Sequence, residues 1–276
     1  MQVHSVISNT ISEEILGTGH LSIRFMADGF SLLLEDREYR PVILNKFTEA
    51  SAISLTSHVL SCSQWLDRND ILDGFRGEVS IVVDSLSTAV VPEELFSKKD
   101  AHLYLQHEKQ IKVNETIKYK SIRKRPFGLV YAVPASILEL SEKFSGKVRI
   151  MPPAEIMLSM ADQVNAADHQ RGFALAEYQT GFMGILIIRN DELVLTNNFE
   201  LKNEEGIVYH TLNALQQLEF DRHNSPLYHS GLEFKNELVT LGRYIRKVLS
   251  LPYQIIDMEK TAIQEHILLA EATRCE

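Results

Sequence analysis

The sequence predicts an α/β fold in which one supersecondary unit occurs twice. Residues 173–199 hold three short apolar segments separated by tight turns at 179–181 and 189–191, a pattern typical of a three-strand antiparallel meander. Residues 21–47 show the same pattern. Aligning the two runs places identical residues together: Gly181 on Gly29, Phe182 on Phe30, Arg189 on Arg37, Val194 on Val42, Asn197 on Asn45 and Phe199 on Phe47. The repeat indicates two similar lobes, each with a mixed sheet that contains one meander.

The length of the chain fits two lobes. It has 276 residues and a mass of 31.4 kDa, enough for two domains of roughly 100 to 150 residues each. We expect a first lobe at 1–170, with a small α/β insert at about 85–150, and a second lobe at 171–276 that ends in a helical tail. Ile263, Ile267 and Ala270 share one helical face of this tail. That face predicts docking on the body of the protein or on a partner, and the pattern does not choose between them.

Composition and charge exclude several classes of protein. A formal net charge of -9 and a pI of about 5.6 argue against nucleic-acid binding, which depends on clustered Lys and Arg. Cys62 and Cys275 form neither a disulfide framework nor a zinc pattern, which favours a reducing cytoplasm. The N-terminus lacks the pattern of a signal peptide, and no window approaches the roughly 20 apolar residues of a membrane span. We therefore expect a cytoplasmic protein without membrane insertion.

The first half predicts these elements in order. Residues 1–19 are a polar lead-in with a short helix at 12–16, and the first meander follows with a hairpin turn at Asp28-Gly29. A helix at 50–68 carries one apolar face, and 78–84 is a buried strand. That face consists of Ala52, Leu55, Val59, Cys62 and Leu66.

The insert has a different pattern from the two repeats. A helical turn at 92–96 and helical character at 101–108 precede two strands at 116–122 and 127–133. The remaining elements are a helix at 134–144, a strand at 148–151 and a helix at about 154–164. Together they predict a β-β-α-β-α subdomain.

The second half repeats the order of the first. After its meander we expect a helix at 203–218, a strand at 226–229, a helix at 233–249 and a strand at 253–257. The helix at 233–249 is predicted from apolar residues at spacings of three and four: Phe234, Leu238, Leu241, Ile245 and Val248.

Residues 117–161 resemble the insert and return segment of the actin-like proteins of type IV pilus assembly and cell division. In that segment a strand pair ends in an apolar-Ala-x-Pro turn, here Tyr131-Ala132-Val133-Pro134, and leads to a helix, a Gly, a strand and a final helix. Over roughly 20–258 the chain is similar to an uncharacterised bacterial family, domain of unknown function 3822. The resemblance implies the duplicated ribonuclease H-like fold of actin-like ATPases, with two lobes and an insert in the first.

The resemblance also implies where Mg-ATP would bind. In the family, two hairpin turns rich in Gly, Ser and Thr wrap the phosphates, and acids on the first strands order the metal's water shell. Here Arg24 or Phe25 stands where the first acid is expected, and only Asp28 and Gly29 remain. Bulky neighbours replace the small residues that let the backbone approach a phosphate.

The second phosphate turn and the adenine motif are altered too. Glu177, Thr180 and Gly181 remain in the turn, without the small Gly that follows the acidic strand end. Ser230 and Gly231 remain of the adenine motif, but Leu232 would crowd a base. The resemblance thus gives seven vestigial cleft candidates, no catalytic residue and no metal ligand. We expect no cofactor, and Mg-ATP only under the alternative below.

Glu177 has two interpretations. As an ordinary structural residue it is an edge charge or a partner of a nearby Arg. Because the first strands of the two lobes approach each other in this fold, we also hypothesise an ion pair between Arg24 and Glu177 in the space that ATP would use. A ribonuclease H-like nuclease is disfavoured, because residues 21–26 carry no carboxylate.

Other chemistry-bearing residues favour structural roles. The pairs His102 and His107, and His223 and His229, lack the spacing of helical metal ligands, so solvated or structural histidines are expected. Cys62 lies on an apolar helix face, where a core thiol is usual. One cationic patch predicts a solvated strand face or, as the minority interpretation, a docking site for an acidic partner; it consists of Lys118, Lys120, Arg123, Lys124 and Arg125.

Two functions follow from these patterns. The first is a catalytically inactive, actin-like binding or scaffold protein that engages a protein partner or a second copy of itself. The alternative is a divergent ATP-binding switch whose lobes close on Mg-nucleotide through Asp28, Thr180 and Ser230.

Overall fold

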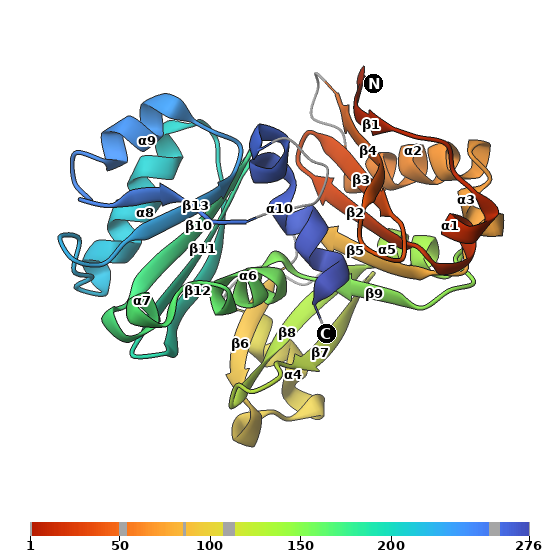
Figure 1. The fold of residues 1–276 in the computed structure, drawn as a ribbon. Coiled ribbons are helices and arrows are strands. Elements are labelled where there is room, and N and C mark those ends of the chain that lie inside the picture. Colours follow the sequence, from red (N-terminus) through yellow and green to blue (C-terminus); the bar gives the residue numbers. More distant parts are fainter. Residues whose placement is uncertain (1, 50–53, 85–86, 107–113, 254–259, 276) are drawn as a thin grey trace. The chain divides into compact units, whose positions relative to one another are not determined.

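The computed structural model describes residues 2–49, 54–84, 87–106, 114–253 and 260–275 (Figure 1). The chain divides into two compact units. Unit 1 comprises Met1–Glu155 and Ala272–Glu276, and unit 2 comprises Ile156–Glu271. These units group residues that are in contact, whereas the predicted lobes at 1–170 and 171–276 were drawn from the sequence repeat. The predicted lobe boundaries therefore stay a prediction.

Unit 1 is built on a mixed six-stranded sheet. Its strand order is β1-β4-β3-β2-β5-β9, in which β2, β3 and β4 form the predicted antiparallel meander and β5 and β9 run parallel to β2. The strands are β1 (Gln2–Ser8), β2 (His20–Met26), β3 (Gly29–Glu35), β4 (Pro41–Thr48), β5 (Glu78–Val83) and β9 (Val148–Met151). The first meander and the buried strand predicted at 78–84 are thereby confirmed.

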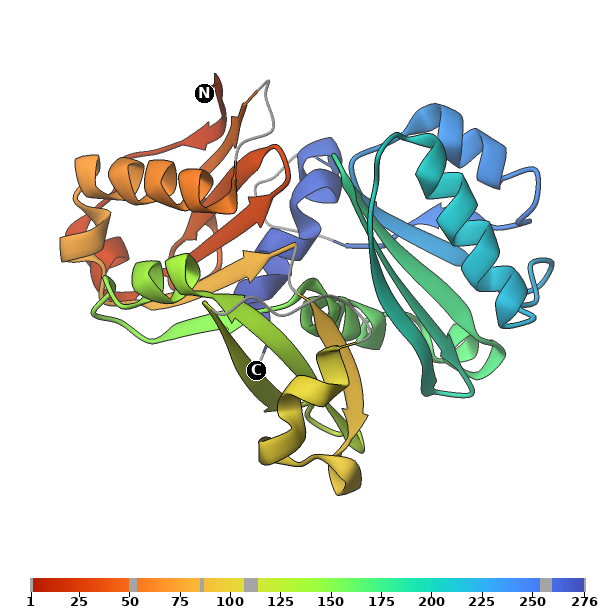
Figure 2. The ribbon, with the colours of Figure 1, turned by 180° about the vertical axis from the view of Figure 1, so that it is seen from behind.

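Helices cover one face of this sheet (Figure 2). They are α1 (Glu13–Thr18), α2 (Leu55–Arg68), α3 (Ile71–Gly74) and α5 (Ala135–Ser141). Helix α2 begins after Ser54, whose hydroxyl accepts from the Ser57 amide, and it buries Val59, Cys62 and Leu66 as predicted. Ala52, which belongs to the same predicted face, lies outside the described residues.

Two strands of unit 1 differ from the prediction. Residues 2–8 were expected as a polar lead-in, yet they form β1, an antiparallel edge strand beside β4. Because β1 is largely exposed, its sequence carries little of the apolar pattern that reveals a strand. The strand Val148–Met151 was grouped with the insert, yet β9 pairs in parallel with β5 in the main sheet.

The insert forms its own three-stranded sheet. Its order is β6-β8-β7, and both pairs are antiparallel. The elements are β6 (Thr88–Pro92), η1 (Glu93–Leu95), η2 (Lys98–Asp100), α4 (Ala101–Leu105), β7 (Glu115–Ser121) and β8 (Phe127–Pro134). Strand β6 was not predicted, and η1 and η2 are 3₁₀ helices. Val91, Leu105, Val130 and Ala132 form a small core between α4 and the sheet.

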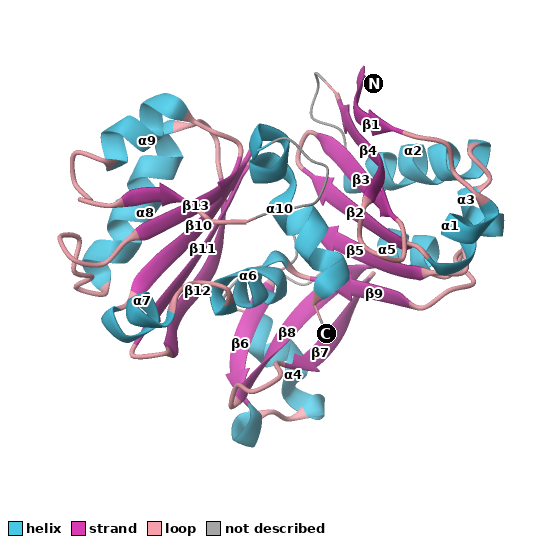
Figure 3. Cartoon of the chain, in the orientation of Figure 1, coloured by secondary structure: helices cyan, strands magenta, loops and turns pink. Residues whose placement is uncertain are grey.

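Unit 2 repeats the strand pairing of unit 1 (Figure 3). Its sheet has the order β12-β11-β10-β13-β14, with an antiparallel meander and β13 parallel to β10. The strands are β10 (Phe173–Gln179), β11 (Phe182–Arg189), β12 (Glu192–Glu200), β13 (Leu227–Gly231) and β14 (Val248–Ser250). The second meander is confirmed, and Asn190 and Asp191 in its second turn both have positive φ. A duplication as the origin of the two halves stays a prediction.

Helices α8 (Glu205–Gln217) and α9 (Lys235–Leu241) cover one face of the sheet of unit 2 (Figure 1). The helix predicted at 233–249 is too long, because α9 ends at Leu241 and β14 follows. Ile245 and Val248 nevertheless pack in the same core as Leu241. Their apolar pattern therefore marks burial and not a continuous helix. Of the strand predicted at 253–257, only Tyr253 is described, and it is not in a strand.

The other face of this sheet carries α6 (Pro153–Asp162) and α10 (Lys260–Arg274), and α7 (Ala166–Arg171) leads into β10. Helix α6 is buried on nearly all sides, as a helix within a core should be. It lies close to β11, since a Cβ added to Gly184 would come within 2.8 Å of Met157 Sδ. The helical tail is confirmed with Ile267 and Ala270 buried, and the side chain of Ile263 lies outside the described residues.

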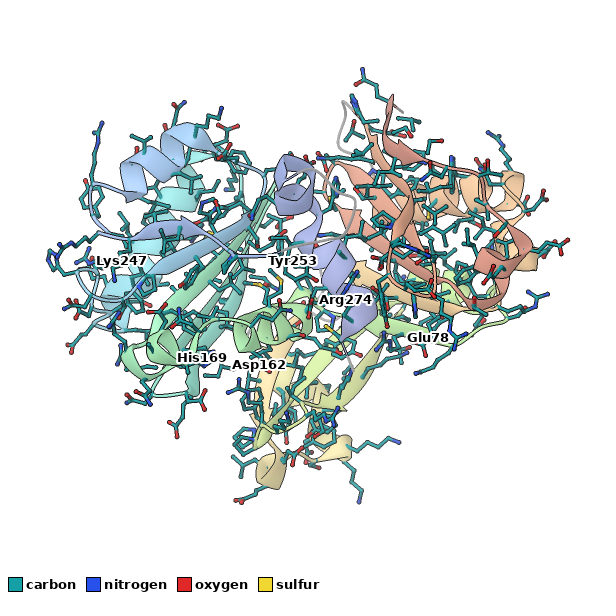
Figure 4. All side chains as sticks on the ribbon, in the orientation of Figure 1. Glu78, Asp162, His169, Lys247, Tyr253 and Arg274 are labelled. Carbon is teal, nitrogen blue, oxygen red and sulfur yellow. The ribbon has the colours of Figure 1, made fainter. Side chains whose placement is uncertain are left out.

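The end of α10 belongs to unit 1 and is held there by polar contacts (Figure 4). Arg274 Nη2 lies 2.8 Å from Glu35 Oε1, and Thr273 Oγ1 donates to Glu35 Oε2 at 2.9 Å. Ser80 Oγ donates to the carbonyl of Ala272 at 2.9 Å. Arg149 donates to the carbonyls of Ala272, Thr273 and Cys275, which caps the C-terminus of the helix. The tail therefore docks on the body of the protein.

Breaking this anchor is expected to destabilise the protein. Glu35 is fully buried, so Arg274→Ala leaves a buried carboxylate without its cation and lowers the free energy of unfolding by about 3 kcal/mol. Urea unfolding measures the difference. Lys147→Ala breaks an exposed ion pair with Glu78 and serves as the control, at less than about 0.5 kcal/mol. Equal losses in the two variants would contradict a role for the anchor.

The same carboxyl should give stability a dependence on pH. Burial raises the pKa of Glu35 above 4.5, against the opposing charge of Arg274. Because the folded protein holds this proton to higher pH than the unfolded chain, the contribution of Glu35 is full below pH 4.5 and is lost as pH rises through the folded pKa. Unfolding measured across this range should show wild type losing stability relative to Glu35→Gln as pH rises. A difference independent of pH would refute the shift, and Glu38→Gln is the exposed control.

Candidate functional site

The hairpin that joins β2 to β3 holds the first two candidates. Asp28 lies in the turn, and its carbonyl accepts from the Glu49 amide at 2.9 Å. Gly29 has a φ of 154°, and a Cβ at this position would come within 1.9 Å of the Phe47 carbonyl oxygen. The glycine is therefore required for close contact between β3 and β4. Asp28 Oδ1 is buried, with no hydrogen-bond partner among the described residues.

A buried ion pair lies on the same strand. Arg24, at the centre of β2, is 2% exposed, and Asp84, directly after β5, is 4% exposed. Arg24 Nε donates to Asp84 Oδ1 at 2.9 Å and Nη2 donates to Oδ2 at 3.2 Å, a bidentate arrangement. The Asp84 amide also donates to the carbonyl of Phe25 at 3.0 Å, which fixes the acid beside β2. Where the resemblance implies an acid, this chain has Arg24, and Asp84 supplies its carboxylate partner.

In unit 2, Glu177 and Ser230 lie side by side. They are register partners on the parallel strands β10 and β13, and both are fully buried. Ser230 Oγ donates to Glu177 Oε2, and Gln179 Nε2 donates to Glu177 Oε1 at 3.1 Å. Since β10 pairs on both sides, Glu177 is not an edge charge, and that interpretation was wrong. The predicted pairing of Glu177 with Arg24 stays a prediction.

The remaining candidates are turn residues. Thr180 is exposed between β10 and β11, and Gly181 has a φ of 71° while its carbonyl accepts from the Leu201 amide at 2.9 Å. Gly231 has a φ of 86°, and a Cβ there would come within 2.1 Å of the Tyr178 carbonyl oxygen. The Leu232 amide donates to the same carbonyl at 2.7 Å. The end of β13 therefore packs directly on the backbone of β10.

Helix α10 contacts β10 beside Glu177. Gln179, which contacts Glu177, also donates through Nε2 to the carbonyl of Glu265 at 3.2 Å. One turn and a half further along the helix, Glu271 accepts from Ser159 of α6 at 2.5 Å and from the hydroxyl of Tyr253 at 2.6 Å. The face of β10 that carries Glu177 is thus closed by the tail of the same chain.

The surroundings of Glu177 and Arg24 do not fit the Mg-nucleotide that the fold family implies. The carboxylate of Glu177 accepts hydrogen bonds from Ser230 and Gln179, and the carboxylate of Asp84 is committed to Arg24. Gly29 and Gly231 lie in close contact with neighbouring backbone. Exposed backbone amides and free carboxylates are what such a site requires.

Each unit holds its own part of the predicted set. Glu177, Ser230 and Gly231 are adjacent in unit 2, with Thr180 and Gly181 at the end of the same strand. Asp28 and Gly29 belong to unit 1. Sequence reasoning missed Asp84 and Gln179 as partners of the central charges. The position of Asp84 at the end of a predicted buried strand was the one available signal.

The other chemistry-bearing residues have structural surroundings. Cys62 is fully buried, which raises the pKa of its thiol and confirms a core cysteine. Burial lowers the pKa of His229. Lys120 pairs with the buried Glu155, so a solvated strand face was wrong for that member of the cationic patch. Among the described residues, no group of three or more His, Cys, Asp or Glu is arranged to hold a metal ion.

Comparison with solved structures shows the fold. A Bacteroides thetaiotaomicron VPI-5482 protein with actin-like ATPase fold and unknown function is 22% identical, with a TM-score of 0.79 over 97% of this chain and 100% of that chain. A PilM-PilN type IV pilus biogenesis complex is 11% identical, with a TM-score of 0.64 over 92% and 97%. The ethanolamine utilization protein EutJ from Carboxydothermus hydrogenoformans is 8% identical, with a TM-score of 0.52 over 97% and 91%.

These likenesses confirm the predicted actin-like ATPase fold, with its mixed α/β architecture. Curated proteins give no match. In the part of the chain that the structure covers, none of the helices has both the length and the apolar character needed to cross a bilayer. Residues 8–248 match the family described as Protein of unknown function (DUF3822), and the chain belongs to this family.

Proposed function

We propose that this protein is a catalytically inactive, actin-like binding or scaffold protein. The observation that supports the proposal best is the enclosure of Glu177: the acid is fully buried, accepts from Ser230 and Gln179, and lies on the strand face that α10 covers. A carboxylate that orders the water shell of Mg²⁺ must face water and the metal. Glu177 instead links β10 to β13 through Ser230, and Gln179 links it to the tail.

The first unit supports the same proposal. A cation at Arg24 would repel Mg²⁺ and would hold a phosphate only if it were released from Asp84. Separating a buried bidentate pair leaves two uncompensated charges, which costs several kcal/mol. Nucleotide binding would have to supply that free energy in addition to its own entropy cost.

A solved complex that contains the same fold supports a role in protein assembly. The PilM-PilN structure, which shares the fold, is a complex of two different proteins. We propose that this chain likewise engages a protein partner or a second copy of itself.

A nucleotide panel tests the proposal. Binding at one hundred times the Kd would stabilise the folded protein by about 2.7 kcal/mol, which corresponds to a rise in Tm of roughly 5 °C or more for a chain of this size. We expect no rise with Mg-ATP, Mg-ADP or Mg-GTP at millimolar concentration. An active actin-like ATPase measured in parallel is the positive control. A rise that requires Mg²⁺ would refute the proposal.

One observation favours the alternative of a divergent ATP-binding switch. Asp28 Oδ1 is a buried acceptor without a partner among the described residues, and it lies in the turn that corresponds to the first phosphate loop. A metal-bound water would satisfy this oxygen.

The alternative makes a different prediction. If Asp28 orders the metal, Asp28→Ala abolishes a Mg-dependent rise in Tm, while Asp73→Ala, which removes an exposed acid of α3 in the same unit, preserves it. The two variants are compared by thermal shift with and without EDTA. Equal rises in both variants would exclude a role for Asp28 in binding.

A further inference from the structure

A cluster of cations lies at one end of the sheet of unit 2. Arg243, Arg246 and Lys247 follow the end of α9 and are all exposed. The Arg246 amide donates to the carbonyl of Arg222 at 3.0 Å, which brings the turn after α8 beside this segment. Figure 4 labels Lys247 at the outer edge of unit 2. Three cations of one short segment thus lie beside Arg222, which comes from a turn about 20 residues earlier in the sequence.

Apolar side chains accompany these cations. Tyr244 is 55% exposed and Leu249, on the edge strand β14, is 43% exposed. Ile245 between them is buried and fixes the segment on the core of the unit. We call this surface the basic edge; it consists of Arg222, Arg243, Tyr244, Arg246, Lys247 and Leu249.

The charges of the basic edge are not used by the fold. Arg222, Arg243, Arg246 and Lys247 form no ion pair with any described residue, whereas Arg171 of the same unit pairs with Asp168. The nearest acid in sequence, Asp221, accepts hydrogen bonds from His223 and Asn224 of its own turn. The cations therefore remain available to a ligand, in a chain whose net charge is -9.

The combination of side chains indicates the class of ligand. Arg and Tyr are the residues most enriched at the energetic centres of protein interfaces, and exposed cations attract carboxylates within a Debye length of about 8 Å. Nucleic acid fits less well, because typical complexes neutralise roughly 6–10 phosphates and do not need exposed Leu. Only three cations of the basic edge, Arg243, Arg246 and Lys247, lie in one segment. The polybasic segments that hold proteins on anionic membranes carry about 4–8 Lys and Arg.

We propose that the basic edge is a docking surface for an acidic segment of a partner protein, in which Asp and Glu flank an apolar side chain. The carboxylates pair with the four cations, and the apolar residue packs between Tyr244 and Leu249. This inference rests on the proposed function as a binding protein and names the surface and the chemistry of the partner. It involves none of the candidate cleft residues.

The test uses the full chain and a fluorescein-labelled peptide of about ten residues, with Asp and Glu on both sides of one Phe. Fluorescence anisotropy at about 50 mM and about 300 mM NaCl should show binding that weakens with salt. Arg246→Glu with Lys247→Glu should weaken binding by at least about tenfold. Lys98→Glu with Lys99→Glu in η2 makes the same change of net charge at an exposed pair in the insert, and should leave binding unchanged.

Several outcomes would overturn the inference. They are absence of binding by wild type, equal weakening in the two double variants, and stronger binding of a duplex DNA or of anionic lipid vesicles through the same residues. Arg246→Gln with Lys247→Gln should weaken binding less than the charge reversal does, and an unchanged Tm shows that each variant is folded. If the peptide does not bind and nucleotides give no rise in Tm, the docking surface is refuted and the proposed function stands. If Mg-ATP raises the Tm, the proposed function is refuted, and the two double variants still decide whether the basic edge binds the peptide.

Discussion

The buried charges of the central strands must be matched by groups of the protein itself. Arg24 on β2, Glu35 on β3 and Glu177 on β10 have almost no exposure to water. An unmatched buried charge costs several kcal/mol, a large part of the net stability of a domain. Asp84, Arg274 and Ser230 supply the necessary partners. Each match fixes a neighbouring element: the end of β5, the end of α10 and strand β13.

This requirement explains the importance of the C-terminal helix. Its unit 2 portion contributes the Glu265 carbonyl to a contact with Gln179 of β10 and the Glu271 carboxylate to contacts with Ser159 of α6 and Tyr253. Its last residues, in unit 1, bring Arg274 to Glu35 and place the final carbonyls against Arg149. Residues of this helix therefore take part in the packing of each unit.

The fold and the chemistry at the turns depend on different groups of the protein. The strand pairing of the actin-like fold is complete in both units, because it depends on backbone hydrogen bonds and on apolar side chains at alternate positions. Chemistry at the turns depends on a few side chains and on glycines with open space. Here Gly29 and Gly231 are used for contacts with the backbone of Phe47 and Tyr178. Under the proposed function, the fold persists while the groups that would bind a nucleotide serve structural contacts.

The sequence alone determined the two meanders, the amphipathic helix that buries Val59 and Cys62, and the family, since these depend on local periodicity and turn residues. It did not predict β1, because an exposed edge strand lacks the alternation of apolar and polar residues. It assigned β9 to the wrong sheet, because the partner of a short strand depends on residues far away in the sequence. It marked Ile245 and Val248 as buried but assigned them to a helix, because the pattern records burial and not hydrogen bonding. Only the tertiary structure paired Arg24 with Asp84 and Glu35 with Arg274, since partners separated by 60 and 239 residues are brought together by folding alone.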